Sequence, residues 1–331
     1  MDIQTEQLLG TLEVLLDKEL DLFLPCHENG AKLKPFVWDT NIQGAFTPLN
    51  LIQSEGWMTQ TDIELAFSSW QWSEDTCLAA KGIFNDCSDY LDDRDDENIV
   101  LDNETKIDRI KKYQVLRNAI EVNIPCIQAF TLSCNSGYSL SIIVGQITEH
   151  EWICLSPTVP QETQCYINKT PSPNNDRIKG LITDPKVYNI SRVGFAIETQ
   201  IKTALKKLGS IQVYGWYHGG YNHLHDYKIV YTVGESFEQV VENALKIAGL
   251  IEIYDFDSFA IGEQIVAYSE DEAKEVEERF QHINVFLNQS FLQLKLYRFC
   301  FWDYENIYII GESKSQDFVG ISIKSQFVYN P

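Results

Sequence analysis

A Pro- and Asn-rich stretch in the middle of the chain constrains its fold more than any other feature. Residues 170–176 have the composition of turns and no apolar periodicity, so they predict a linker or a long loop. The stretch divides 331 residues into two nearly equal parts, and the whole length is comfortable for two domains. We therefore expect one domain at residues 1–165 and another at residues 178–331, joined by a linker at residues 166–177.

The two parts repeat the same coarse order of elements. Each begins with a helix (residues 4–20 and 195–208) and a strand pair, the second pair at residues 211–217 and 227–233. Each then contains a long helix (residues 104–122 and 270–288) and three closing strands. The closing strands contain similar short sequence motifs, Ile142-Ile143-Val144-Gly145-Gln146 and Tyr308-Ile309-Ile310-Gly311-Glu312. This pattern predicts an internal duplication and an α+β fold, with two similar α/β/α sandwich domains whose sheets are largely antiparallel.

Composition excludes several classes of protein. Apolar residues make up 44% and aromatic residues 12%, which is enough to bury a core and argues against global disorder. No apolar run approaches the roughly 18 residues of a membrane span, and the acidic start does not resemble a secretory signal. The eight cysteines form no C-x-x-C pair and no disulfide framework. We expect a soluble protein in the reducing cytoplasm.

The charge is strongly acidic and unevenly distributed. The formal net charge is −22, and residues 1–165 contain 27 acids against 10 bases. Such a field repels nucleic acid and anionic membranes and attracts a basic protein partner. The alternative is that the acidity only keeps the protein soluble.

The second part carries the most specific sequence signal. Asp255-Phe256-Asp257-Ser258-Phe259 precedes the long helix, and the strands after it contain Leu296-Tyr297-Arg298-Phe299, Tyr308-Ile309-Ile310-Gly311-Glu312 and Gly320-Ile321-Ser322-Ile323-Lys324. This order resembles the nuclease A inhibitor family over residues 255–324. The first part is similar by element order and by Pro35-Phe36-Val37-Trp38. The resemblance implies an α/β/α sandwich that blocks a sugar-nonspecific, magnesium-dependent endonuclease and catalyses nothing itself. In that mode, carboxylate and hydroxyl oxygens stand in for the scissile phosphate near the metal.

The resemblance also implies where the partner binds. One family contact comes from an acidic loop between the first two strands, where Glu28 is the nearest candidate. A second uses the end of the chain after the last strand, but this sequence continues past Lys324 to Pro331. The terminal group therefore cannot occupy the same place unchanged. Near that end, Glu312, Asp317 and Ser322 are candidate partner-binding residues, and the alternative is that they only complete the sheet.

An acidic stretch at residues 86–104 offers a further candidate surface. It can imitate a phosphate track for a basic nuclease cleft through Asp92, Asp93, Asp95, Asp96 and Glu97. The alternative is a solvated loop whose last acids cap the following helix.

The best indication of an enzyme is a histidine-rich turn. His218, His223 and His225 can present a metal site, but Gly219-Gly220 between them is typical of an exposed hairpin. No P-loop, dinucleotide-binding glycine pattern, G-x-S-x-G or zinc-protease motif is present. We predict no metal, no cofactor and no catalysis.

The leading hypothesis is a tandem inhibitor-like protein that binds and blocks a nuclease or a related basic effector. The first alternative is a non-inhibitory interaction or sensing module of a defence or assembly complex. The second is a metal-dependent enzyme that uses the histidine turn.

Overall fold

The computed structural model describes residues 1–24, 30–71, 103–134, 139–158, 190–215, 223–264, 269–301 and 304–326. These residues form two compact units. Unit 1 contains the described parts of Met1–Glu55 and Leu250–Pro331, and unit 2 contains those of Gly56–Pro160 and Thr183–Gly249. These boundaries differ from the predicted domains at residues 1–165 and 178–331. The reason is strand pairing, because each unit builds its sheet from strands of both halves of the chain.

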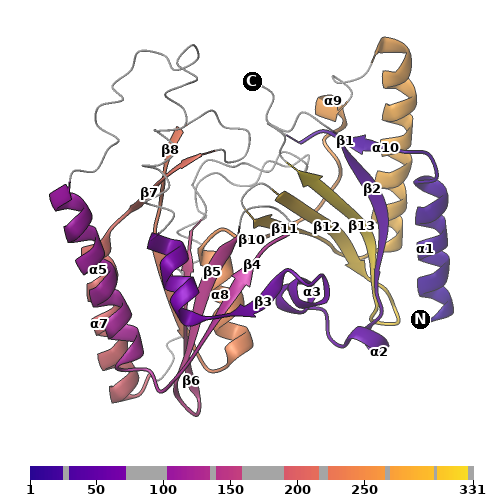
Figure 1. Ribbon diagram of the computed structural model, residues 1–331. Coiled ribbons are helices and arrows are strands. Elements are labelled where there is room, and N and C mark those ends of the chain that lie inside the picture. The colour runs from indigo at the N-terminus through magenta and orange to yellow at the C-terminus, as the bar shows by residue number, and fades with distance from the viewer. Residues whose placement is uncertain are drawn as a thin grey trace, which may run out of the picture. The chain divides into compact units, whose positions relative to one another are not determined.

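Unit 1 is a six-stranded antiparallel sheet in the order β1-β2-β13-β12-β11-β10. Its strands are β1 (Asp21–Leu22), β2 (Ala31–Trp38), β10 (Ile251–Asp255), β11 (Leu294–Phe301), β12 (Tyr304–Glu312) and β13 (Phe318–Gln326). Its helices are α1 (Ile3–Leu15), α2 (Thr40–Gln43), α3 (Pro48–Ser54), α9 (Ile261–Gln264) and α10 (Glu270–Ser290). Figure 1 shows α1 and α10 on one side of this sheet and α3 on the other.

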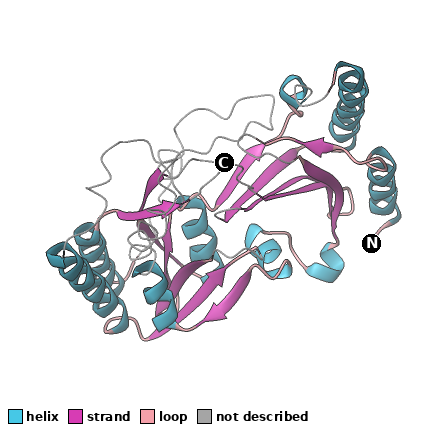
Figure 2. Cartoon of the chain, turned by 45° about the horizontal axis from the view of Figure 1, so that its top comes forward, coloured by secondary structure: helices cyan, strands magenta, loops and turns pink. Residues whose placement is uncertain are grey.

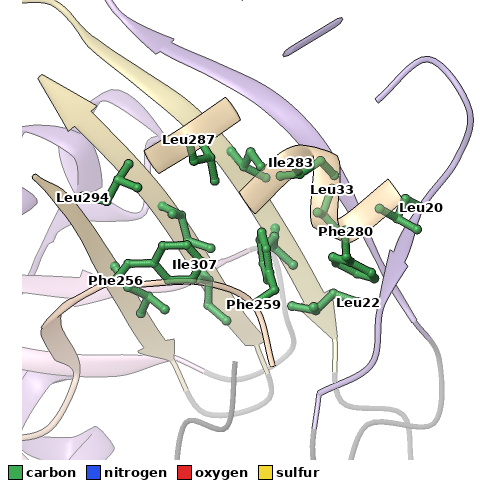
Figure 3. Packing of buried hydrophobic residues seen from close by; sticks show 14 of the residues in the cluster. Leu20, Leu22, Leu33, Phe256, Phe259, Phe280, Ile283, Leu287, Leu294 and Ile307 are labelled. Atoms are coloured by element: carbon green, nitrogen blue, oxygen red, sulfur yellow. The ribbon is translucent and has the colours of Figure 1, made fainter. Parts of the chain in front are cut away.

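The core of unit 1 lies between the sheet and the pair α1 and α10. Phe280, Ile283 and Leu287 of α10 recur at helical spacing and are fully buried against the sheet. Leu22 and Leu33, from the N-terminal strands, join the same cluster (Figure 3). Alternating apolar residues of β11, β12 and β13 supply the sheet's share of this core, so the first and last segments of the chain fold together.

Unit 2 is a five-stranded antiparallel sheet in the order β3-β4-β5-β6-β9, with a separate pair β7-β8. Its strands are β3 (Met58–Thr61), β4 (Cys126–Leu132), β5 (Leu140–Thr148), β6 (Glu151–Pro157), β7 (Ile211–Gly215), β8 (His223–Tyr227) and β9 (Ile229–Gly234). Its helices are α5 (Asn103–Glu121), α7 (Arg192–Leu208), α8 (Phe237–Ile247) and a helix at residues 63–71. Figure 2 distinguishes these strands and helices by colour.

The helices of unit 2 pack on its sheet and on one another. α5 packs beside α7, and α7 contacts β5. α8 contacts β9, β6 and β5, where Phe237 packs on Phe130 and Trp152. The predicted hairpin between residues 211–217 and 227–233 is wrong. β7 pairs with β8, while β9 pairs with β6, from the other half of the chain.

The coarse prediction of an α+β fold with antiparallel sheets is confirmed. Within the described ranges, no helix is long and apolar enough to cross a membrane. The four described cysteines, Cys126, Cys134, Cys154 and Cys300, form no disulfide with one another, and all but Cys126 are buried. Burial raises the pKa of the Cys154 thiol far above its ordinary range, so this cysteine behaves as a core residue.

Candidate functional site

The predicted partner-binding residues divide into two groups. Glu28 and the acids of the 86–104 stretch lie outside the described residues, and those acids are Asp92, Asp93, Asp95, Asp96 and Glu97. Glu312, Asp317 and Ser322 lie in unit 1, on β12, β13 and the turn between them. The structure therefore places three of the predicted residues, and their environments differ.

Glu312 lies at the surface. It is the last residue of β12 and faces Phe318 across the ladder to β13. Its side chain is exposed. A carboxylate in this position is open to a basic side chain of a partner and loses little hydration until that partner arrives.

Asp317 is buried and forms hydrogen bonds inside unit 1. Its side chain has no exposed surface. One carboxylate oxygen accepts from the Thr5 hydroxyl at 2.9 Å, and the other accepts from the backbone N–H and the hydroxyl of Thr40 at 3.0 and 3.1 Å. Burial alone raises the pKa of Asp317, but these donors outweigh it and hold the pKa below the ordinary value. Asp317 thus holds the β12–β13 turn against α1 and α2.

The turn that carries Asp317 is itself closely hydrogen-bonded. The Ser313 N–H donates to the Asp317 carbonyl at 2.7 Å, and the Gln316 N–H donates to the Ser313 carbonyl at 3.0 Å. Gln316 has φ = 68°, a left-handed conformation that a tight turn imposes. The hydroxyls of Ser313 and Ser315 lie 2.9 Å apart, and Thr5 lies within 2.9 Å of Ser315. This polar cluster fixes the backbone next to Glu312.

Ser322 lies in the middle of β13, opposite Lys34 of β2 and Tyr308 of β12. Its hydroxyl is largely buried and donates to the Lys34 carbonyl at 3.5 Å, a long hydrogen bond. On this α3 side of the sheet, Glu55 accepts from the Tyr308 hydroxyl at 3.0 Å and pairs with Lys324 at 2.6 Å. Ser322 therefore contributes to the sheet, where Lys34 lies opposite it and Lys324 follows two residues later.

A buried ion-pair cluster links strands β10, β11 and β12 of unit 1. Arg298 of β11 pairs with Glu252 of β10 at 2.9 Å and also pairs with Glu305 of β12. All three side chains are at least nine-tenths buried. Since a buried charge is tolerated only when it is paired and hydrogen-bonded, this cluster fixes the register of three strands.

Glu151 of unit 2 occupies a place similar to that of Asp317. It begins β6, directly after the β5–β6 turn, and its carboxylate accepts from the Ser191 hydroxyl at 2.7 Å and from the Ser191 backbone N–H. The Thr148 hydroxyl adds a third donor at 3.1 Å. Burial raises the pKa of Glu151, but the donors outweigh it and lower the pKa below the ordinary value. Ser191 is the N-cap of α7, so Glu151 anchors the start of that helix.

The histidine turn is only partly described. His218 and the side chains of His223 and His225 lie outside the described residues. Among the side chains that are described, no three His, Cys, Asp or Glu residues are grouped to hold a metal.

Comparison with known families gives one result. The family model described as nuclease A inhibitor-like protein matches residues 222–326. No curated protein matches the chain. The matched residues run from β8 to β13, so the predicted resemblance of the second part of the chain is confirmed at the family level.

Sequence reasoning missed the residues that hold these acids in place. Thr5, Thr40 and Ser191 are ordinary hydroxyl residues near helix starts, and the only available signal was their helix-capping chemistry. That signal predicts local hydrogen bonds and gives no indication of an acid more than 250 residues away, as in the contact between Thr40 and Asp317.

Proposed function

We propose that this protein is an inhibitor that binds and blocks a nuclease, or a related basic nucleic-acid-processing effector, and catalyses no reaction itself. The observation that carries the proposal is the match of residues 222–326 to the nuclease A inhibitor-like family. The net charge of −22 supports it, because an acidic protein is attracted to the basic cleft of a phosphate-binding enzyme. A magnesium-dependent nuclease in the cytoplasm is the partner we expect.

The predicted contacts Glu28 and Glu312 belong to segments next to strands of unit 1. β13 runs antiparallel to β2, with Ile323 opposite Leu33, so the end of β13 lies beside the beginning of β2. The predicted contact Glu28 precedes the start of β2 in sequence, whereas the exposed acid Glu312 pairs with Phe318, which lies opposite Trp38 at the end of β2. We propose that acids from these segments occupy the phosphate and metal site of the partner.

We further propose that the chain is a tandem duplication, with a first repeat at residues 1–158 and a second at residues 190–326. The long helices support it, because their buried positions follow one spacing. In the first repeat they are Tyr113, Leu116, Ile120 and Ile124. In the second they are Phe280, Ile283, Leu287 and Phe291, at the same intervals. Helices buried along one face commonly show this spacing, and here both series also end just before the next strand, as a repeat requires.

A pair of strand glycines supports the duplication independently. Gly145 of β5 faces Ile124, and Gly311 of β12 faces Phe291, the residues that follow the two long helices. A methyl group at either glycine would overlap that side chain. Both repeats therefore need glycine at the same place, for the same packing reason. On this basis we propose that each unit has three layers, with helices on both faces of an antiparallel sheet.

The test is inhibition of a defined enzyme. Purified chain is titrated into a sugar-nonspecific, magnesium-dependent endonuclease, and nicking of supercoiled plasmid is followed at fixed Mg²⁺. We expect nicking to stop near stoichiometric inhibitor, with a complex on size exclusion. Neutralising five acids of the 86–104 stretch should weaken inhibition about tenfold or more, since each removed charge lessens attraction to a basic cleft. Those acids are Asp92, Asp93, Asp95, Asp96 and Glu97.

A matched control keeps the same change in net charge. It neutralises five exposed acids elsewhere, Glu6, Glu13, Glu149, Glu235 and Glu278. Equal loss of inhibition in both variants would show that only total charge matters. Stable binding to the nuclease without inhibition would favour the alternative of a non-inhibitory interaction or sensing module. Neither binding nor inhibition, including of any nuclease encoded beside this protein, would refute the proposal.

A further inference from the structure

Each unit combines segments from both halves of the chain, and the two units do so by the same rule. We name the opening segments 1–55 and 190–249, and the closing segments 56–158 and 250–326. Unit 1 combines the first opening segment with the second closing segment, and unit 2 combines the second opening segment with the first closing segment. Each unit therefore contains one opening and one closing segment, taken from different repeats.

The two sheets correspond strand by strand. Apart from the edge strand β1, the order in unit 1 is β2-β13-β12-β11-β10, and in unit 2 it is β9-β6-β5-β4-β3. β2 and β9 are the last strands of the two opening segments, and each pairs with the last strand of the other repeat. The registers also correspond, since Ser322 lies opposite Lys34 and Ser156 lies opposite Val230. The two opening strands thus fill equivalent places in each other's repeat.

The crossing point is the same residue in both repeats. α3 ends at Ser54 and α8 ends at Ile247, and each is followed by one capping residue and then a glycine. Gly56 has φ = 71° and Gly249 has φ = 77°, the left-handed conformation that favours glycine after a helix. Unit 1 gives way to unit 2 at Gly56, and unit 2 gives way to unit 1 directly after Gly249.

Polar contacts of three closing-segment residues join each closing segment to the opening segment of the other repeat. Asp317 binds Thr5 and Thr40, Glu151 binds Ser191, and Lys324 pairs with Glu55. Residues 222–326, which the family model matches as one contiguous stretch, fall into both units, on either side of Gly249.

We infer that the two repeats exchange their opening segments within one chain, so that each inhibitor-like unit is composed of both repeats. The inference rests on the duplication proposed above and is independent of nuclease inhibition. It means that a partner bound at unit 1 contacts both repeats, the first through β2 and the second through β12 and β13. The family-matched stretch by itself holds an incomplete half of each unit.

Engineered cysteine pairs test the exchange in the full chain. Lys34→Cys with Ser322→Cys, and Ser156→Cys with Val230→Cys, place cysteines opposite each other in the exchanged arrangement. Two control variants recombine the same four substitutions: Lys34→Cys with Ser156→Cys, and Ser322→Cys with Val230→Cys. In these variants the two cysteines lie opposite each other only if each repeat keeps its own opening segment. We expect intrachain disulfides under mild oxidation in the first two variants and none in the recombined two. Peptide mapping by mass spectrometry identifies the two cysteines in each disulfide and so distinguishes the engineered bonds from any bond to a native cysteine.

A zero-length carbodiimide cross-link tests the same point in the unmodified chain. Lys324 lies 2.6 Å from Glu55 in the exchanged arrangement. Without exchange, the position equivalent to Glu55 is Ala248, which has no carboxylate to couple. We expect a Glu55–Lys324 cross-link in the monomer band. Disulfides in the recombined variants, no Glu55–Lys324 cross-link, or a cross-link found only in dimers would each overturn exchange within one chain. Loss of nuclease inhibition would leave these cross-links unchanged.

Discussion

The turns before the last strands of the two repeats, β6 and β13, each carry an acid that binds hydroxyl residues of an N-terminal helix, but the residues differ. In unit 1, Asp317 is fully buried and binds Thr5 of α1 and Thr40 of α2. In unit 2, Glu151 is only half buried and binds Ser191 at the start of α7. Each acid fastens an N-terminal helix to the sheet, so the contact is shared. The difference in burial predicts that unit 1 depends on its acid more strongly than unit 2.

The largest expected effect is that of Asp317→Ala. It leaves the Thr40 N–H and two hydroxyls inside unit 1 without their acceptor, which we expect to lower the free energy of unfolding by about 3 kcal/mol. Urea unfolding followed by tryptophan fluorescence and far-UV circular dichroism measures it. Asp317→Asn is the matched control, since it keeps the shape and one acceptor and should lose less. An Asp317→Ala chain as stable as the parent would show that Asp317 does not hold the turn.

The strand glycines give the next largest effect. Gly311→Ala forces a methyl group into the Phe291 ring and should cost about 2 kcal/mol, because a packed core cannot yield without strain. Gly145→Ala meets the smaller Ile124 side chain and should cost about 1 kcal/mol. Thermal unfolding of the two variants orders these costs. The double variant Gly311→Ala with Phe291→Leu should recover part of the loss, and failure to recover would refute the steric explanation.

Removing the second acid sharpens the comparison of the turns. Glu151→Ala should cost about 1.5 kcal/mol, less than Asp317→Ala, because water can replace part of what a half-buried carboxylate provides. The same urea experiment measures it. A Ser191→Ala chain removes the N-cap as well as a donor, so its loss should not add fully to that of Glu151→Ala. Full additivity would show that the two residues act separately.

Both carboxylates also predict a pH dependence. The pKa of Asp317 and of Glu151 is lowered in the folded chain, so each stabilises the fold at pH values above the ordinary carboxyl pKa. That contribution is lost as the pH falls through the folded-state pKa. Unfolding free energies measured between pH 6 and pH 3 should therefore fall less steeply for Asp317→Asn and Glu151→Gln than for the parent. Parallel curves would show that neither acid is linked to folding.

Local sequence patterns predicted the helices well and the pairing of distant strands poorly. The long helices expected at residues 104–122 and 270–288 occur at Asn103–Glu121 and Glu270–Ser290, because their periodicity is a local property. The pairing partner of β9 was predicted wrongly. Adjacency favoured a hairpin at residues 211–217 and 227–233, but β9 pairs with β6, more than 70 residues away. Periodicity specifies which face of a strand is buried and does not specify its neighbour.

The candidate site was likewise predictable only as far as local sequence reaches. A sequence cannot distinguish an exposed acid from a buried one in the same strand-end pattern. Glu312 and Asp317 are therefore equal candidates by sequence, yet Glu312 is exposed and Asp317 binds two threonines of the N-terminal segment. Those threonines come near only through the pairing of β2 with β13, which no local pattern encodes. Among the described predictions, Glu312 is the acid that a partner can reach without unfolding.

The smallest effect is expected at the contact of Glu55 with Lys324. This pair is partly exposed, so Glu55→Gln should cost only about 0.5 kcal/mol. The amide still accepts from the Tyr308 hydroxyl, which separates the ion pair from the hydrogen bond. Raising the salt concentration should reduce the difference between Glu55→Gln and the parent, since salt screens exposed charges. A loss near that of Asp317→Ala, unaffected by salt, would place the main polar contact between the repeats on the α3 side of the sheet and not at the β12–β13 turn.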